Sequence, residues 1–259
     1  MAKKAKSNLA KITQMLRNRW EGFARVFPRL ASILRIGSKI VVIVFIMDIG
    51  YMTAIWPEWK WYTSGPVPRS TFIEHYEHES SQNPNLPRLR WQPVKLERIP
   101  PIMLKTLVAA EDSRFYQHEG IDTEAFKSAM EYNWQQKRIV YGASTISQQT
   151  VKNMFLSGSR NPLRKWHELI LTWALERNLN KKRILELYLN VAEFGRGIYG
   201  IEAASRYYWN KPASRLTVIQ AIELAATLPA PKKHNPRTRS SFFKKKRAKI
   251  MRNMGMKRK

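Results

Sequence analysis

The chain of 259 residues carries a formal net charge of +27, with 44% hydrophobic residues and no cysteine. That hydrophobic content is typical of a protein with a packed core, so wholesale disorder is excluded, and the missing thiols exclude disulfides and thiolate metal sites. The charge calls for an anionic partner, either nucleic acid or a membrane with its lipid phosphates.

The N-terminal segment is basic and precedes an apolar run. Residues 1–39 carry ten Lys or Arg against a single acid, Glu21, and their apolar residues recur at helical spacing until Pro28 interrupts them. We interpret this segment either as an amphipathic segment on an anionic membrane surface or as a solvated basic tail. Residues 40–56, flanked by Lys39 and a stretch rich in Trp, reach the lower length limit of a bilayer-spanning helix, about 17 residues.

We expect residues 40–56 to form a retained transmembrane anchor, because no small-residue cleavage site of a signal peptide follows them. A buried core helix is the alternative, and Asp48 would cost about 2.5–3.5 kcal/mol at the centre of a bilayer. The aromatic and basic flanks favour the anchor. The positive charge before it predicts a cytoplasmic N-terminus and a following domain on the outer side.

Residues 57–94 are rich in proline and polar residues, which predicts an extended linker with a short strand near residues 70–73. Pro100 and Pro101 then begin the first helix of a globular domain. A helix of this kind is typical of a compact domain, so we expect the folded part of the chain to start here.

The apolar run 102–110 leads into Glu111 and Asp112, and His118 and Gly120 follow within ten residues. A carboxylate backed by apolar packing can have a raised pKa and act as a general acid or base. The alternative is that the two acids merely end a helix in solvent.

Two further helix starts follow. Asp122 predicts the N-cap of a helix, with a buried face formed by Ala125, Phe126, Ala129, Met130 and Trp134. Thr145 and Gln148 form a capping-box pattern at the start of the next helix. With a glycine before it, hydroxyls at its start and Lys152 two turns on, this helix is suited to phosphate, although an ordinary capped helix has the same pattern.

Asn161 and Pro162 predict a helix that runs to about residue 178. Its inward residues at helical spacing are Leu163, Trp166, Ile170, Trp173 and Ala174. Arg164 and Glu168 share one face, either as a surface ion pair or as a functional carboxylate in a basic site with Arg160 and Lys165.

The remaining pattern is also helical. We expect helices over 181–191, over 201–209, and from the capping-box pattern of Thr217 and Gln220 to Pro229. Residues 231–259 hold thirteen Lys or Arg and no acid, which predicts a disordered basic tail.

Five stretches, in order, resemble the five motifs of the peptidoglycan glycosyltransferases of family 51, specifically the monofunctional membrane-anchored members. They are Glu111–Gly120, Gly142–Asn153, Arg164–Glu168, Ile184–Ile201 and Leu216–Pro231. Two positions depart from the family pattern, with Gln220 where Glu is usual and His234 where Tyr is usual. Gln also serves at the third position of a capping box, so the first departure is structurally mild.

The resemblance implies a mostly α, lysozyme-like, two-lobed helical domain over residues 95–236, with a smaller membrane-touching lobe, preceded by one transmembrane helix and followed by a basic tail over 237–259. Because no transpeptidase segment follows, we expect a monofunctional enzyme. The resemblance also implies polymerisation of lipid II into linear glycan strands by inverting transfer, with undecaprenyl pyrophosphate leaving. The enzyme is then expected in the bacterial inner membrane, with its catalytic domain on the periplasmic side.

By the same resemblance Glu111 is the general base, and Glu168 is a second catalytic acid that orients the donor or a metal. The implied substrate-binding residues are Asp112, His118, Ser144, Gln149, Lys152, Asn153, Arg160, Arg164 and Lys165. A divalent cation, Mg²⁺ or Mn²⁺, is implied at the pyrophosphate, and no organic cofactor. The expected partners are lipid II, the growing strand, anionic lipids and cell-wall synthesis proteins, without nucleic acid.

Two other classes of function stay open at this point. A lytic muramidase could share the fold and the glutamate, but it would have no use for cations aimed at a pyrophosphate. A basic membrane- or nucleic-acid-binding protein could explain the net charge of +27. However, the basic residues concentrate in the two terminal segments, on either side of an apolar anchor.

Overall fold

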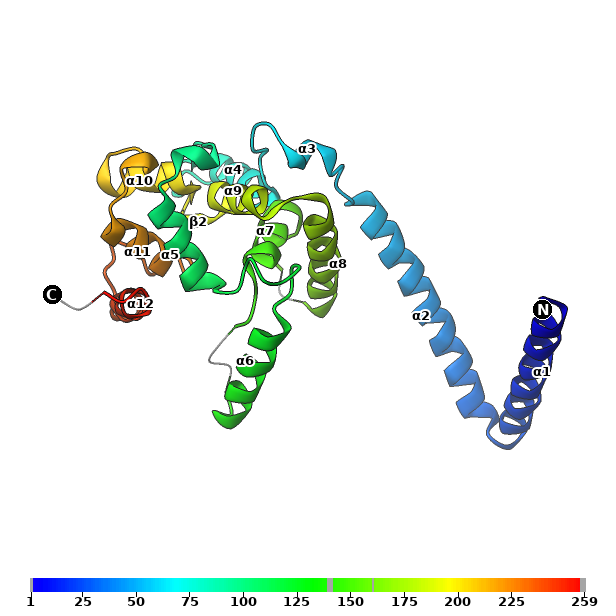
Figure 1. The fold of residues 1–259 in the computed structure, drawn as a ribbon. Helices are drawn as coiled ribbons and strands as arrows, with labels where there is room; N and C mark the ends of the chain where they lie inside the picture. Colours follow the sequence, from blue (N-terminus) through cyan, green and yellow to red (C-terminus); the bar gives the residue numbers. More distant parts are fainter. Residues whose placement is uncertain (1, 139–141, 160, 257–259) are drawn as a thin grey trace. The chain divides into compact units, whose positions relative to one another are not determined.

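The computed structural model describes residues 2–138, 142–159 and 161–256, and it divides into two compact units, Met1–Trp56 and Pro57–Lys259 (Figure 1). The first unit consists of α1 (Ala2–Val26) and α2 (Pro28–Ala54). Pro28 lies in the first turn of α2, where its missing N–H costs nothing, so it begins this helix. Residues 40–54 of the apolar run expected at 40–56 are therefore part of a longer helix, which among the described residues is long and apolar enough to cross a membrane.

The second unit is mostly helical, as expected, with a small sheet beside the helices. Its helices are α3 (Lys60–Thr63), α4 (Thr71–Gln82), α5 (Pro101–Glu111), α6 (Thr123–Gln135), α7 (Ile146–Phe155), α8 (Pro162–Asn178), α9 (Lys181–Val191), α10 (Ile201–Trp209), α11 (Val218–Thr227) and α12 (Ser241–Asn253), with the 3-10 helices η1 (Leu96–Arg98) and η2 (Ala213–Arg215). In the sheet, β3 (Ile198–Tyr199) pairs in parallel with β1 (Arg90–Trp91) and antiparallel with β2 (Glu193–Gly195).

The core of this unit surrounds α7 and α9, which pack on each other, and α8 covers α7 (Figure 1). Leu187 and Tyr188 of α9 and Ile146 and Val151 of α7 are fully buried. A second layer forms where α5 packs on α11 and α11 packs on α12. Burial of this kind contributes about 25 cal/mol per Å² of apolar surface, which fixes the helices that position the site.

Two glycines permit close backbone contacts that position the site. Gly120 has a φ of +91°, and a Cβ there would lie 2.8 Å from Cγ2 of Thr172 in α8. Gly200 has a φ of +81°, and a Cβ there would lie 2.7 Å from the carbonyl oxygen of Asn190. Any other residue would be strained at these angles and would clash, so Gly120 allows its loop to lie directly against α8.

The segment expected to be an extended linker is partly helical, and the strand expected near residues 70–73 is wrong. Ser70 caps α4 instead, and its Oγ accepts a hydrogen bond from the N–H of Ile73 at 3.2 Å. The prolines of this segment lie before and after α4 and so mark its limits. Ile73 and Tyr76 are buried, which anchors α4 to the rest of the second unit.

Two faces expected to be buried are largely exposed. No residue of α6 is buried, and Phe126, Met130 and Trp134 are 54%, 54% and 85% exposed. On α8, Leu163, Trp166 and Trp173 are about half exposed, whereas Ala174 is buried as expected. The predictions were wrong because helical spacing identifies an apolar face without saying what covers it.

The basic segment after Pro231 contains an ordered helix, so the prediction of a disordered tail is wrong. Phe243 and Ile250 of α12 are each 2% exposed and belong to one core cluster with Ile222, Ala225 and Ala226 of α11. Phe243 and Ile250 lie two turns apart on one face of the helix. Their burial stabilises α12 in spite of the repulsion among its basic residues.

Candidate active site

The first functional carboxylate is Glu111, the last residue of α5, whose side chain is 10% exposed. Its Oε2 accepts a hydrogen bond from Nε2 of Gln149 in α7 at 3.2 Å, and its Oε1 lies 3.6 Å from Nζ of Lys246 in α12. Burial raises the pKa of this carboxyl, while the charge of Lys246 and the bond from Gln149 lower it and the charge of Asp112 raises it. A buried carboxylate whose pKa is raised in this way is suited to taking up a proton.

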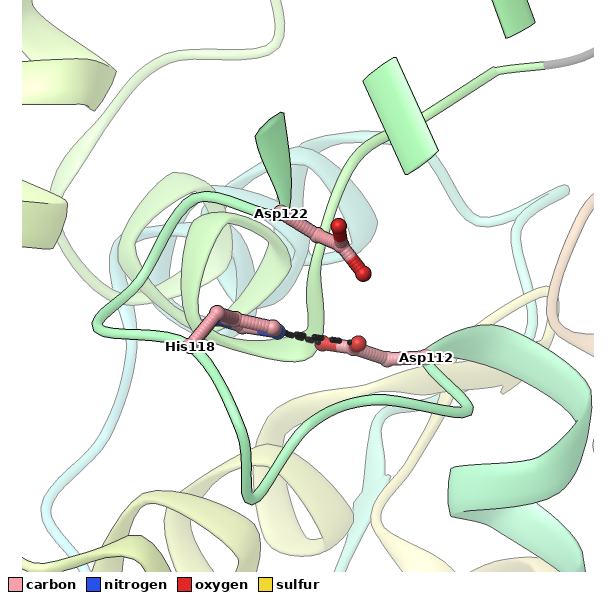
Figure 2. A group of neighbouring side chains, drawn as sticks. All are labelled: Asp112, His118 and Asp122. Carbon is pink, nitrogen blue, oxygen red and sulfur yellow. Dashed lines mark hydrogen bonds and ion pairs between the residues drawn. The ribbon is translucent and has the colours of Figure 1, made fainter. Parts of the chain in front are cut away.

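Asp112, directly after Glu111, is buried and turned to the interior (Figure 2). Its two carboxylate oxygens accept from Nε2 of His118 at 3.0 and 3.1 Å, and Oδ2 also accepts from the backbone N–H of Ile146 at 2.9 Å. Because a carboxylate only accepts, Nε2 carries the proton. Asp112 thus ties the end of α5 to the loop of His118 and to the start of α7.

Asp122 completes the one group, among the described residues, whose spacing could hold a metal ion: ligand atoms of Asp112, His118 and Asp122 lie within 4.8 Å of one another (Figure 2). The carboxylate oxygens and Nε2 of His118 already have partners in the chain, whereas Nδ1 of His118 is buried with no hydrogen-bond partner among the described residues. Oδ1 of Asp122 caps α6 by accepting from the N–H of Ala125, and Oδ2 lies 3.3 Å from Nε of Arg114. The group forms an internal polar network, and a divalent cation at the pyrophosphate stays a prediction.

The start of α7 is a capping box, as predicted. Oγ1 of Thr145 accepts from the N–H of Gln148 at 3.1 Å, and Oε1 of Gln148 accepts from the N–H of Thr145 at 3.0 Å. Thr145 also donates from Oγ1 to the carbonyl of Gly120 at 2.6 Å, which joins this helix to the first loop. Because the N–H groups of Ile146 and Gln148 are taken by Asp112 and Thr145, the arrangement favours the ordinary capped helix over a phosphate site at its N-terminus.

A cationic cluster lies on the facing sides of α7 and α8. Glu168 is 2% exposed, and its Oε2 accepts from Arg164 at 2.8 Å while Oε1 pairs with Lys165. Lys152 is half-buried, and burial lowers its pKa, against the charge of Glu168, which raises it. Both oxygens of Glu168 are thus engaged by basic side chains of the same helix. Three cations surround a single buried carboxylate here, and the excess positive charge suits an anionic ligand.

Two clefts adjoin at Ser144, which is exposed and lines both. The first, of about 420 Å³, is lined by Glu111, Asp112, Asp122, Tyr132 and Ser144, among others. The second, of about 470 Å³, is lined by Ser144, Gln149, Lys152, Arg164, Lys165 and Glu168, among others. Because Gln149 of the second cleft donates to Glu111 of the first, Glu111 and the cations are parts of one continuous site.

Most of the residues expected from the sequence thus come together around the two clefts. Arg160 lies outside the described residues. Asn153 is buried in α7, and His118 is buried against Asp112; their contacts with a substrate stay predictions.

Sequence reasoning missed Tyr188 and Lys246 as members of the site. The hydroxyl of Tyr188 donates to Oε1 of Gln149 at 3.0 Å, and Lys246 faces Glu111. The spacing of Phe243 and Ile250 was the available signal for an ordered helix around Lys246.

Comparisons with known proteins agree on one family. The transglycosylase family model matches residues 81–255. A biosynthetic peptidoglycan transglycosylase of Laribacter hongkongensis is 42% identical over 76% of this chain and 85% of its own length, and one of Mannheimia succiniciproducens is 52% identical over 62% and 66%. The observed helical architecture agrees with the lysozyme-like domain expected from the motifs. The chain therefore belongs to the transglycosylase family.

Proposed function

We propose that this protein polymerises lipid II into linear peptidoglycan strands by a single inverting glycosyl transfer. The observation that carries the proposal is the pairing of a buried carboxylate, Glu111, with the cations of the adjoining cleft, joined through Gln149. This combination supplies a base for a sugar hydroxyl and a countercharge for a pyrophosphate leaving group. The motifs and the peptidoglycan transglycosylase relatives support the same reading.

In the proposed step Glu111 accepts the proton of the 4-hydroxyl of the acceptor GlcNAc, and that oxygen attacks C1 of the donor MurNAc. The bond from C1 to the pyrophosphate oxygen breaks as the new bond forms, so an α-linked donor becomes a β-1,4 linkage. The raised pKa of Glu111 favours this role, because a carboxylate with a higher pKa is a stronger base for the hydroxyl proton. The transition state resembles that of glycoside hydrolysis, with a sugar hydroxyl in place of water.

Lys152, Arg164 and Lys165 would stabilise the charge that develops on the leaving pyrophosphate. All three line the second cleft, and Glu168 holds two of them in place through ion pairs. In this mechanism Glu168 acts by fixing the cations that face the donor. Arg160, expected to join them, keeps that role as a prediction. A divalent cation at the pyrophosphate stays a prediction, and the step described here needs only residues of the chain.

We further propose that α2 anchors the protein in the bacterial inner membrane, with a cytoplasmic N-terminus and the second unit on the periplasmic side. The basic residues before the apolar part of α2 support this orientation. The exposed apolar side chains of α6 and α8, Phe126, Trp134, Trp166 and Trp173 among them, suit a domain that contacts lipid to reach a lipid-borne substrate. Anionic lipids would attract the basic surface, and cell-wall synthesis proteins are proposed partners.

The direct test is incubation of the purified full-length protein with lipid II in detergent. We expect linear glycan that a muramidase can digest. Degradation of finished glycan without polymerisation of lipid II would identify a lytic enzyme instead. That alternative leaves the three cations of the second cleft without a role.

A further inference from the structure

The helix α12 lies next to the base although its sequence is far from every other part of the site. Its buried residues Phe243 and Ile250 pack in a cluster to which Ala110, the neighbour of Glu111, also contributes. Oγ1 of Thr106 in α5 lies 3.4 Å from the sulfur of Met254 at the other end of the helix. The packing between α12 and α5 therefore fixes where the basic side chains of α12 can reach.

Adjacent basic residues of α12 have different partners. Nε of Arg247 lies 3.2 Å from Oε1 of Glu223, which ties α12 to α11. Nζ of Lys246 lies 3.6 Å from Oε1 of Glu111, with the lysine side chain 25% exposed and the glutamate side chain 10% exposed. Lys245, one position earlier, is exposed to solvent. Lys246 is thus the residue of this basic stretch that is directed at the carboxylate.

Lys246 is the cation that faces Oε1 of Glu111. Gln149 of α7 donates to Oε2, and Oε1 is buried without a hydrogen-bond partner among the described residues. The other titratable groups around this carboxylate are Asp112, Lys152 and Tyr188: the charge of Asp112 raises the pKa of Glu111, and the charge of Glu111 raises the pKa values of Lys152 and Tyr188. The ammonium of Lys246 is the closest compensating charge.

We propose that Lys246 is a positioning residue for the reaction, which holds Oε1 of Glu111 from α12 so that the base stays ionised and aimed at the acceptor hydroxyl. This inference rests on the proposed function. A buried carboxylate without a nearby cation is protonated too readily to accept a proton at neutral pH. At 3.6 Å the ammonium supplies charge, while the lone pairs of Oε1 remain available for the incoming proton.

The test compares kcat as a function of pH for full-length wild type and variants in detergent at saturating lipid II. Lys246→Met removes the charge and keeps the chain length, Lys246→Arg keeps the charge, and Lys245→Met is the matched control. We expect Lys246→Met to move the acidic limb of the kcat profile to higher pH by about one unit. At pH values on the acidic side of that limb, kcat should then fall roughly tenfold. Lys246→Arg and Lys245→Met should retain the wild-type limb.

A folded Lys246→Met enzyme with the wild-type limb overturns the proposal and leaves the proposed function intact. A wild-type protein that does not polymerise lipid II overturns both. Should Lys246→Met fail to fold, the same substitution together with Glu111→Gln should restore folding, because no buried carboxylate is then left uncompensated. A double variant that also fails to fold makes Lys246 a structural residue and refutes the proposal.

Discussion

The hydroxyl of Tyr188 donates a hydrogen bond to the side-chain carbonyl of Gln149 at 3.0 Å, and this bond fixes which end of the amide faces Glu111. Because the oxygen of the amide accepts from Tyr188, its nitrogen is left to donate to Glu111. Tyr188 is fully buried in α9, so it acts on the base from the core of the domain.

We therefore predict that Tyr188→Phe lowers kcat by about tenfold and the free energy of unfolding by about 1–3 kcal/mol. The amide oxygen of Gln149 loses its buried donor, and the amide is no longer held in one orientation. The readouts are lipid II polymerisation and thermal unfolding. Tyr116→Phe, on an exposed tyrosine that lines neither cleft, is the control. Equal stabilities and rates for Tyr188→Phe and wild type would remove Tyr188 from the site.

Local signals predicted the helix starts well. Asp122, Thr145, Asn161 and Thr217 each cap the helix expected of them, because a cap is a contact between residues three positions apart. Gln220, where Glu is usual in the family, forms a capping box with Thr217.

The contacts that the sequence could not predict are long-range ones. Which face of α6 or α8 is covered depends on elements far along the chain, and so does the approach of Lys246 to Glu111. The basic residues of α12 favoured a prediction of disorder, because runs of like charge are usually disordered, and its two buried apolar positions were therefore missed. His234 likewise gained a partner only in the fold, the hydroxyl of Ser240 at the start of α12, at 2.8 Å.

A second prediction concerns Lys152, one of the cations proposed to stabilise the leaving pyrophosphate. Lys152→Ala should lower kcat by roughly 100- to 1000-fold at saturating lipid II, the cost of one removed transition-state contact. Lys105→Ala, at an exposed lysine of α5, should lower kcat by less than about tenfold. A Lys152→Ala enzyme within about threefold of wild type would show that this lysine has no part in stabilising the leaving group.

The pH dependence of stability should contain a contribution from Glu193 in β2. Burial raises the pKa of Glu193 to about 7 from an ordinary 4.5, against the charges of Lys232 and Arg196. The folded state then binds this proton more tightly, so the stabilisation is complete below about pH 4.5 and is lost as the pH rises through about 7.

Glu193→Gln mimics the protonated form, so we predict equal stability at pH 4 and a gain over wild type of up to about 3 kcal/mol at pH 8. Thermal unfolding at several pH values measures the difference. Glu131→Gln, an exposed acid of α6, should show no such trend. A constant difference between Glu193→Gln and wild type from pH 4 to 8 would contradict the assignment.

The order of α12 can be tested through its buried aromatic residue. Phe243→Ala should lower the free energy of unfolding by about 3–5 kcal/mol, the cost of a large cavity in a core. Phe242, its neighbour, is 45% exposed, and its change to alanine should cost much less. If both variants unfold at the wild-type temperature, the C-terminal basic segment is a tail and not a packed helix.

Glu111 is proposed above as the base of a lipid II polymerase. The most direct measurement is the turnover of lipid II by purified full-length Glu111→Gln beside wild type, with thermal unfolding as the check that both are folded. We predict that the wild type forms glycan and that the Glu111→Gln protein, which should be at least as stable, forms no detectable glycan. Polymerisation at the wild-type rate by a folded Glu111→Gln protein would contradict it.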